Sequence, residues 1–336
     1  LRAYIEDVRA LLERTIVADP TVPEAYYNYA RYFIYTADIS KAQSQLEYAL
    51  DVFAKAKTKT KSRILKNIDT YRLLGELYTD QQEYLKSEEI YVKGISLFEA
   101  EKDASSLEAG KEIGLLYADM ADLDYFISGD NDNALRNYLH AVEYDNDTSS
   151  IRYRIGYIQY GKKNYIDALA SFIASAEENG TDLHLLLSLA NTLSLRDDNF
   201  AAQGYYQRFV DVFAKYKAQK GLLFPQVQAE DADLVENYMK ATNNFGVTLG
   251  KLSFRTGDSN QNALAMVYMA ESMRAWDALT RNQETLVRLD GSNLAAQNMQ
   301  YLRYPVSPFE PALYFDIPRT LQDEKVLTQP TLKNPR

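Results

Sequence analysis

Residues 134–141 read Ala134-Leu135-Arg136-Asn137-Tyr138-Leu139-His140-Ala141. Their small, aromatic and small positions return twice along the chain at intervals of 34 residues, from 134 to 168 to 202. Positions 0, +4 and +7 lie on one face of an α-helix, so the stretch predicts a helix that recurs. The small residues allow close approach to a neighbouring helix, and the aromatic residue fills the gap between units. The later copies are Ala168, Phe172 and Ser175, then Ala202, Tyr206 and Phe209, although Phe209 is larger than a close helix contact usually allows.

A second pattern precedes each of these helices. Its best copy is Leu74-Gly75-Glu76-Leu77-Tyr78 with Tyr84 in the following turn, and Ile155-Gly156 opens another good copy. A 34-residue unit with these two halves resembles the tetratricopeptide repeat (TPR) family. The resemblance implies an all-α fold, a right-handed superhelical solenoid of antiparallel helix pairs. Further copies include Tyr26, Tyr29, Ala30 and Phe33, then Leu186, Leu189, Ala190 and Leu193, and weaker ones near Ile113 and Phe245.

The spacing between copies is irregular outside the centre of the chain, which a solenoid tolerates because each unit contacts only its neighbours. We expect the insertion at 57–67 to extend helices, and those at 122–130 and 220–231 to form loops. The chain opens with an apparent second helix that lacks its first, so we expect more repeats before Leu1 in the parent protein. The predicted parts are half a truncated repeat (1–22), about six irregular repeats (23–285), a terminal helix (286–303) and an extended tail (304–336).

The tail differs in composition from the rest of the chain. Six of the nine prolines lie after residue 304, and proline is excluded from helix interiors. The tail also carries Phe309, Tyr314, Phe315 and Ile317, which are unfavourable in water if they cluster. We therefore expect an extended, Pro-rich segment that lies against the solenoid or against a partner.

Charge and composition limit the classes of function. The net charge of -10 and the pI of about 4.9 disfavour binding to nucleic acid and to anionic lipid. No apolar run reaches the roughly 20 residues of a membrane-spanning helix, so direct membrane insertion is not expected. The absence of cysteine removes disulfides, thiolate nucleophiles and zinc–thiolate sites. It does not determine the compartment, since such a chain folds in either redox environment.

No catalytic motif is visible. The two histidines, His140 and His184, belong to different units and have no second ligand at a metal-binding spacing, which favours structural roles. The stretch 130–133 resembles the start of a calcium loop but lacks its glycine and its closing glutamate, so helix capping explains it better. We predict no metal, no cofactor and no enzymatic activity.

The TPR resemblance implies a partner-binding groove, because the first helices of the family line a concave surface. We expect a peptide, a helix or a neighbouring subunit to bind there. Tyrosines at 153, 157 and 160 share one helix face and suit an interface. The alternative is that these tyrosines only pack between units. The predicted groove residues are Tyr27, Arg31, Tyr35, Arg72, Glu76, Tyr153, Tyr157, Tyr160, His184 and Asn191, with Ile34 and Leu187 beside them.

Two functions follow from this interpretation. The first is a non-catalytic scaffold for protein–protein interactions that uses the Tyr-rich groove. The second is a structural subunit of a larger assembly. The closing stretches 292–302 and 311–317 resemble the end of spirochaete periplasmic flagellar collar proteins, which implies a flagellar motor scaffold. That resemblance favours a periplasmic location, with a cytoplasmic one as the alternative.

Overall fold

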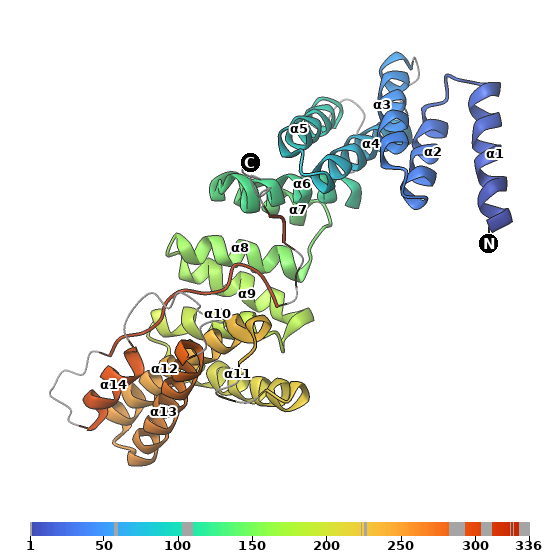
Figure 1. Cartoon of the computed structure of the whole chain (residues 1–336). Coiled ribbons are helices and arrows are strands. Elements are labelled where there is room, and N and C mark those ends of the chain that lie inside the picture. The colour runs from blue at the N-terminus through green and yellow to red at the C-terminus, as the bar shows by residue number, and fades with distance from the viewer. Residues whose placement is uncertain are drawn as a thin grey trace, which may run out of the picture. The chain divides into compact units, whose positions relative to one another are not determined.

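The computed structural model describes residues 2–56, 60–102, 110–222, 224, 227–281, 293–303, 311–322, 324 and 326–328. Every regular element in these ranges is a helix, and most helices lie in antiparallel pairs (Figure 1). The all-α, TPR-like arrangement of helix pairs is therefore confirmed. The chain divides into two compact units: unit 1 holds Leu1–Asp147 and Lys325–Arg336, and unit 2 holds Thr148–Glu324. The boundaries predicted from the sequence stay a prediction.

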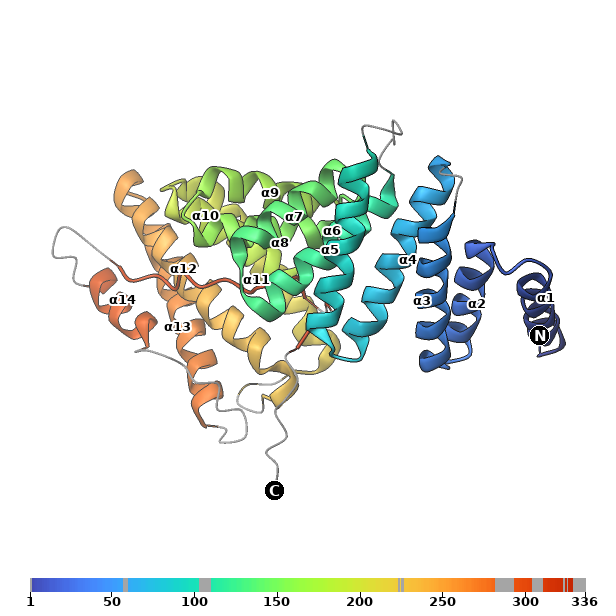
Figure 2. The same ribbon diagram turned by 90° about the horizontal axis from the view of Figure 1, so that it is seen from above.

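Unit 1 begins with α1 (Arg2–Ala18), which packs on the first helix pair (Figure 2). Tyr29 on that pair donates a hydrogen bond to Glu13 of α1 at 2.6 Å. The pairs of unit 1 are α2 (Pro23–Tyr35) with α3 (Ile39–Lys55), α4 (Lys61–Asp80) with α5 (Tyr84–Glu101), and α6 (Lys111–Asp122) with α7 (Asn131–Glu143).

The prediction of a loop at 122–130 is wrong for most of this range. Residues Leu123–Ser128 continue α6 as a turn of π-helix, and Gly129 then reverses the chain with a φ of 71°. The reason is burial, because Tyr125 is fully buried against Tyr138 with ring centroids 6.1 Å apart. A loop would expose this side chain, whereas a wider helical turn keeps it in the core.

In its described residues, unit 2 contains three further pairs, which α14 (Leu294–Arg303) follows. The predicted terminal helix 286–303 thus holds a helix in its later part, and 286–292 lie outside the described residues. After α14, residues 311–322 run without regular secondary structure. The pairs are α8 (Ser149–Gly161) with α9 (Tyr165–Asn179), α10 (Leu183–Leu195) with α11 (Asn199–Lys220), and α12 (Ala232–Thr256) with α13 (Ser259–Arg281), preceded by the short 3-10 helix η2 (Ala229–Asp231).

The recurring small and aromatic positions make the contacts within each pair. Ala168 and Phe172 on α9 are both fully buried. A Cβ atom on Gly156 of α8 would come within 2.6 Å of the Phe172 ring, closer than side chains tolerate. The aromatic residue of the second helix therefore requires a glycine at this position of the first helix.

Four of the turns inside the pairs share one conformation. Ala37, Gln82, Lys163 and Asp197 all have a φ between 58° and 64°. In each case the next N–H donates to a carbonyl five residues back, such as Asn164 N to Gln159 O at 2.9 Å. This is the Schellman arrangement at a helix C-terminus, and it fixes how the chain enters the second helix.

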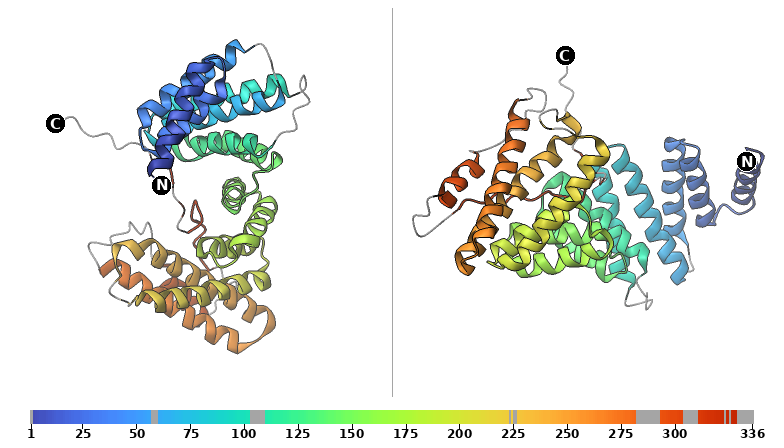
Figure 3. Two further views of the ribbon diagram at one scale, coloured as in Figure 1. Left: turned by 90° about the vertical axis from the view of Figure 1, so that its right-hand side faces the viewer. Right: turned by 90° about the horizontal axis from the view of Figure 1, so that it is seen from below.

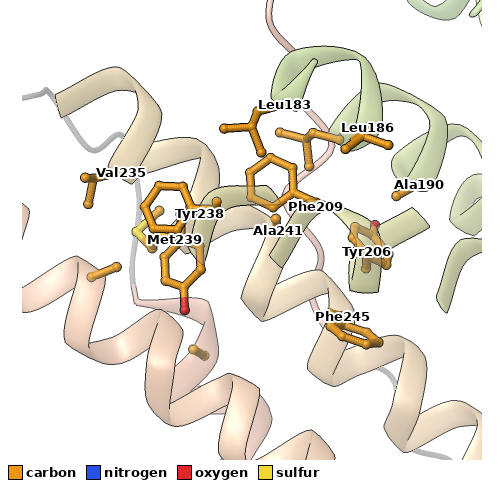
Figure 4. Close-up of a cluster of buried hydrophobic side chains, with 14 of the residues drawn as sticks. Leu183, Leu186, Ala190, Tyr206, Phe209, Val235, Tyr238, Met239, Ala241 and Phe245 are labelled. Atoms are coloured by element: carbon orange, nitrogen blue, oxygen red, sulfur yellow. The ribbon is translucent and has the colours of Figure 1, made fainter. Parts of the chain in front are cut away.

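A large hydrophobic core lies in unit 2 (Figure 4). Leu183 and Leu186 of α10 meet Phe209 of α11 and Tyr238 of α12 there. Phe213 stacks on Tyr238 with ring centroids only 4.1 Å apart. Aromatic side chains bury large areas and dominate such cores. Among the described residues, no helix combines the length and apolar character that crossing a membrane requires.

Candidate functional site

The predicted groove residues of unit 1 mostly bind one another. The buried Tyr27 donates a hydrogen bond to Asp69 at 2.5 Å, and burial together with this bond raises the Tyr27 pKa. Arg72 reaches three carboxylates, those of Asp69 at 3.4 Å, Glu76 at 3.1 Å and Asp119 at 3.4 Å. Burial raises the pKa of Asp119 to about 7, against the opposing effect of Arg72. These side chains are therefore already engaged in hydrogen bonds and ion pairs with one another.

Two other predicted residues of unit 1 lie at the end of α2. The guanidinium of Arg31 lies 6.0 Å from the centroid of the Tyr27 ring, and Tyr35 is exposed. The described structure gives neither of them a contact to an extended segment.

The predicted groove residues of unit 2 contact the protein's own C-terminal region. The docked segment is the name used here for 311–324, and its described residues, 311–322 and 324, run from α14 past α12 and α10 to α8 (Figures 1 and 3). Four of the predicted side chains bind its carbonyl groups. Tyr160 donates to Phe315 O at 2.6 Å, Tyr153 to Pro318 O at 2.7 Å, His184 to Thr320 O at 2.8 Å, and Asn191 to Tyr314 O at 3.2 Å.

The bond from His184 also determines its tautomer. A backbone carbonyl accepts hydrogen bonds and cannot donate, so Nδ1 of His184 carries the proton. Close by, Asp182 caps α10 by accepting from Leu185 N at 3.0 Å and accepts from Gln322 N of the docked segment at 2.8 Å. Burial raises the Asp182 pKa, and these two N–H donors oppose that shift.

Three asparagines that the sequence did not single out bind the docked segment through their side-chain amides. Asn298 of α14 donates to Ala312 O at 2.7 Å and accepts from Ala312 N at 3.0 Å. Asn244 of α12 does the same for Tyr314, with distances of 2.7 Å and 2.9 Å. Asn243 donates to Ala312 O at 3.3 Å. Each bidentate amide pairs with the main chain as a neighbouring β-strand would, at alternate residues of an extended chain.

Apolar side chains hold the middle of the docked segment. Ile317 and Leu321 are buried in a cluster with Phe172, Leu185 and Leu189. Tyr157, the third predicted tyrosine of α8, is half-buried at the edge of this cluster, and burial raises its pKa. The three tyrosines of α8 therefore lie together, next to the docked segment.

Charged side chains bind two carboxylates of the docked segment. Arg154 pairs with Glu324 at 3.2 Å, and the two side chains are only 9% and 13% exposed. Lys240 bridges Glu236 of its own helix and Asp316. Burial disfavours the charged form of Lys240, but the bonds to Asp316 and Glu236 outweigh it and raise the Lys240 pKa. We call the surface formed by these residues of α8, α10, α12 and α14 the tail-binding face.

A signal for the missed asparagines existed in the sequence. Asn243 and Asn244 directly precede Phe245-Gly246, a weak repeat copy for which the sequence pattern predicted no groove residues. The interval of 61 residues from Ala202 to Ala263 concealed that this copy was equivalent to the others. Asn298 lies on the short last helix, which has no partner helix in the repeat pattern.

The remaining polar groups have structural roles. His140 lies 3.1 Å from Glu143 and its ring is 4.9 Å from that of Tyr117. Asp130 caps α7 through the N–H groups of Asp132 and Asn133 at 3.2 and 3.0 Å, which is the capping role expected for this stretch. Within the ranges given above, no three His, Asp or Glu side chains gather as metal ligands would.

Comparison with known proteins gives similarity in fold. No protein-family model matches the sequence, and no curated protein matches it significantly. Several of the similar solved structures are TPR proteins. YrrB, described as a TPR protein with an unusual peptide-binding site, has a TM-score of 0.47 and 16% identity over 60% of this chain and 91% of its own.

Two further structures are similar to the same degree. The C-terminal part of a TPR protein from Cytophaga hutchinsonii has a TM-score of 0.47 and 14% identity, covering 86% of this chain and 95% of its own. PilF from Pseudomonas aeruginosa has a TM-score of 0.47 and 13% identity, covering 65% and 91%. None of these three is a flagellar collar protein, so that resemblance stays a prediction.

Proposed function

We propose that this chain is a non-catalytic scaffold for protein–protein interactions, and that its tail-binding face holds an extended polypeptide. The observation that carries the proposal is the bidentate pairing of Asn244 and Asn298 with the main chain of Tyr314 and Ala312. Main-chain recognition by a row of fixed side chains is a general way to bind an extended segment.

The chemistry of the face supports binding over catalysis. Beside the charged Arg154 and Lys240, its polar groups are amides, phenols and one imidazole, and the hydrogen bonds from these uncharged groups go to main-chain carbonyl groups of the docked segment. Tyr153 donates to a carbonyl and also shares a hydrogen bond of 2.9 Å with Ser188, so its position is fixed from behind. A face fixed in this way loses little entropy when it binds a ligand.

The test uses the full chain with its own segment released. We call the full chain carrying Ile317→Asp and Leu321→Asp the open variant, because two carboxylates in the apolar cluster are strongly unfavourable. A fluorescent peptide with the sequence of residues 311–324 should bind this variant in a saturable, one-to-one manner. Hydrogen exchange of α10 checks that the fold is intact. The proposal would be contradicted if hydrogen exchange showed that the amides of the docked segment were exposed to solvent and the peptide still did not bind.

A second candidate function is a structural subunit of a larger assembly, such as the flagellar collar that the sequence resemblance implies. It is favoured by a pocket of about 360 Å³ between α12, α13 and α14, where Phe254 and Tyr301 are exposed. Exposed aromatic side chains beside a pocket suit a protein contact. Phe254→Asp should then reduce self-association or assembly in sedimentation velocity experiments, and an unchanged profile would argue against this candidate.

A further inference from the structure

The next inference rests on the proposed function and concerns the partner. We propose that the tail-binding face selects an acidic, extended segment of another protein through four anchor positions, and that the docked segment competes with this partner in cis. The anchors are the positions of Asp316, Ile317, Leu321 and Glu324.

Main-chain bonds leave most side chains of the ligand free to vary. Tyr160 binds the carbonyl of Phe315, while the Phe315 side chain is 47% exposed. His184 likewise binds the carbonyl of Thr320. Since every residue other than proline presents the same main-chain groups, these contacts supply affinity without selecting a sequence.

The two apolar anchors add selectivity. Ile317 and Leu321 are buried among the side chains of α8, α9 and α10, four residues apart in an otherwise exposed or half-buried stretch. A ligand must therefore present large aliphatic groups at this spacing. A smaller residue at either position would leave a cavity in the cluster.

The two charged anchors differ in strength because they differ in burial. Arg154 and Glu324 are almost wholly removed from water, so loss of the Glu324 carboxylate leaves Arg154 buried without this partner. Lys240 is also buried, but the Asp316 side chain is 64% exposed and Glu236 already neutralises Lys240. Exposed pairs contribute little, so Glu324 should select strongly and Asp316 weakly.

The net charge of the chain strengthens this selectivity. A protein with a net charge of -10 repels acidic peptides in general. Only a segment that places its carboxylates at Lys240 and Arg154 gains compensating attraction. The tail-binding face therefore discriminates among acidic segments by position.

Attachment in cis gives the docked segment an advantage over any free ligand. A tethered ligand acts at an effective concentration of the order of millimolar. A partner with the same anchors therefore binds the unaltered chain weakly, and binds strongly once the docked segment is released. A free partner must therefore bind tightly enough, or be concentrated enough, to displace the docked segment.

The experiment measures binding of 14-residue peptides, based on residues 311–324, to the open variant and to the unaltered full chain. Against the open variant, Glu324→Gln in the peptide should weaken binding by about thirtyfold or more, and Ile317→Ala by about tenfold or more. Asp316→Asn should weaken it by less than about fivefold. The matched controls Phe315→Ala and Thr320→Ala keep their carbonyls and should bind within about twofold of the parent peptide.

The outcomes separate the two proposals. If the parent peptide fails to bind the open variant, the proposed function itself is wrong. If it binds, but the anchor substitutions have no more effect than Phe315→Ala, main-chain binding stands and the selection by anchors is refuted. If the unaltered chain binds the parent peptide as tightly as the open variant does, competition in cis is refuted. Hydrogen exchange of Ala312, Tyr314 and Gln322 reports whether the docked segment has left in each case.

Discussion

Gly75 of α4 and Tyr91 of α5 are in direct contact, and a Cβ atom at Gly75 would lie 2.2 Å from Cε1 of Tyr91. The Tyr91 ring is fully buried and cannot move towards solvent. Ser87, one turn earlier on α5, donates a hydrogen bond to Gly75 O at 2.8 Å. The two helices of this pair are therefore held at a separation that only glycine permits.

Gly75→Ala should destabilise the protein by about 1–3 kcal/mol, because the methyl group overpacks the contact with Tyr91. Gly204→Ala is the matched control. Gly204 also lies inside a helix, but a Cβ atom there would meet nothing within 4 Å, so alanine should stabilise by about 0.5–1 kcal/mol. Denaturant unfolding of both variants measures the difference. Equal changes in the free energy of unfolding for the two variants would contradict a close contact between Gly75 and Tyr91.

Lys163→Gly should raise the free energy of unfolding by up to about 1 kcal/mol. Lys163 is exposed and has a φ of 64°, a region that glycine adopts freely and other residues adopt at a cost. Lys163→Val should lower it, because a β-branched residue is the least suited to this conformation. Thermal and denaturant unfolding test both, and a valine variant as stable as the glycine variant would show that the turn adopts another conformation.

Asn244→Ala should loosen the docked segment without unfolding α12. The substitution removes the acceptor of Tyr314 N and one donor to Tyr314 O. We expect amide exchange at Tyr314 to accelerate about tenfold or more, since one hydrogen bond contributes about 1 kcal/mol and a buried acceptor is lost as well. Asn262→Ala on α13 of the same helix pair is the control and should leave Tyr314 unchanged.

The stability of the chain should depend on pH through Asp124. Burial raises the pKa of Asp124 to about 6, with Asp130 and Glu88 acting in the same direction and Asn137 and Arg136 opposing. The folded state therefore holds this proton more tightly than the unfolded state, whose pKa is near 3.9. Stability should fall as the pH rises from about 4 to 6, by at most about 3 kcal/mol, and then level off.

Asp124→Asn removes this titration and keeps an oxygen that can accept from Asn137, whose amide lies 2.9 Å from the Asp124 carboxylate. The variant should therefore be more stable than the unaltered chain at pH 7, and the two should converge near pH 4. Unfolding free energies at several pH values provide the comparison. An identical slope in both proteins would show that other groups cause the pH dependence.

The helix pairs were predictable from the sequence because their contacts repeat. Phe172 meets Gly156, which lies sixteen residues earlier, and Tyr91 meets Gly75 at the same separation, so one pattern predicts several contacts. The π-helical turn at Leu123–Ser128 was not predictable, since the buried Tyr125 lies in an insertion between repeat copies, to which the pattern assigns no position.

The candidate site was predictable in part. Family positions led to Tyr153, Tyr160, His184 and Asn191, all of which bind the docked segment. The identity of the occupant was not predictable, because a Pro-rich segment has no periodicity that indicates where it docks. The sequence analysis treated packing between units and binding as alternative roles for Tyr153. Tyr153 has both roles, since its ring packs against Phe172 and its hydroxyl donates a hydrogen bond to Pro318 O.

The path of the docked segment has a consequence for how unit 2 unfolds. In a stack of helix pairs each pair contacts only its neighbours, so the ends can fray independently. The docked segment is a single extended stretch of chain that binds α14, α12, α10 and α8 at once, and it therefore links the helices at the two ends of the stack to those between them. If α8 or α14 unfolds, its hydrogen bonds to the docked segment must break, or the docked segment must leave the other helices as well. The unfolding of the outer helices is therefore coupled to that of the central ones.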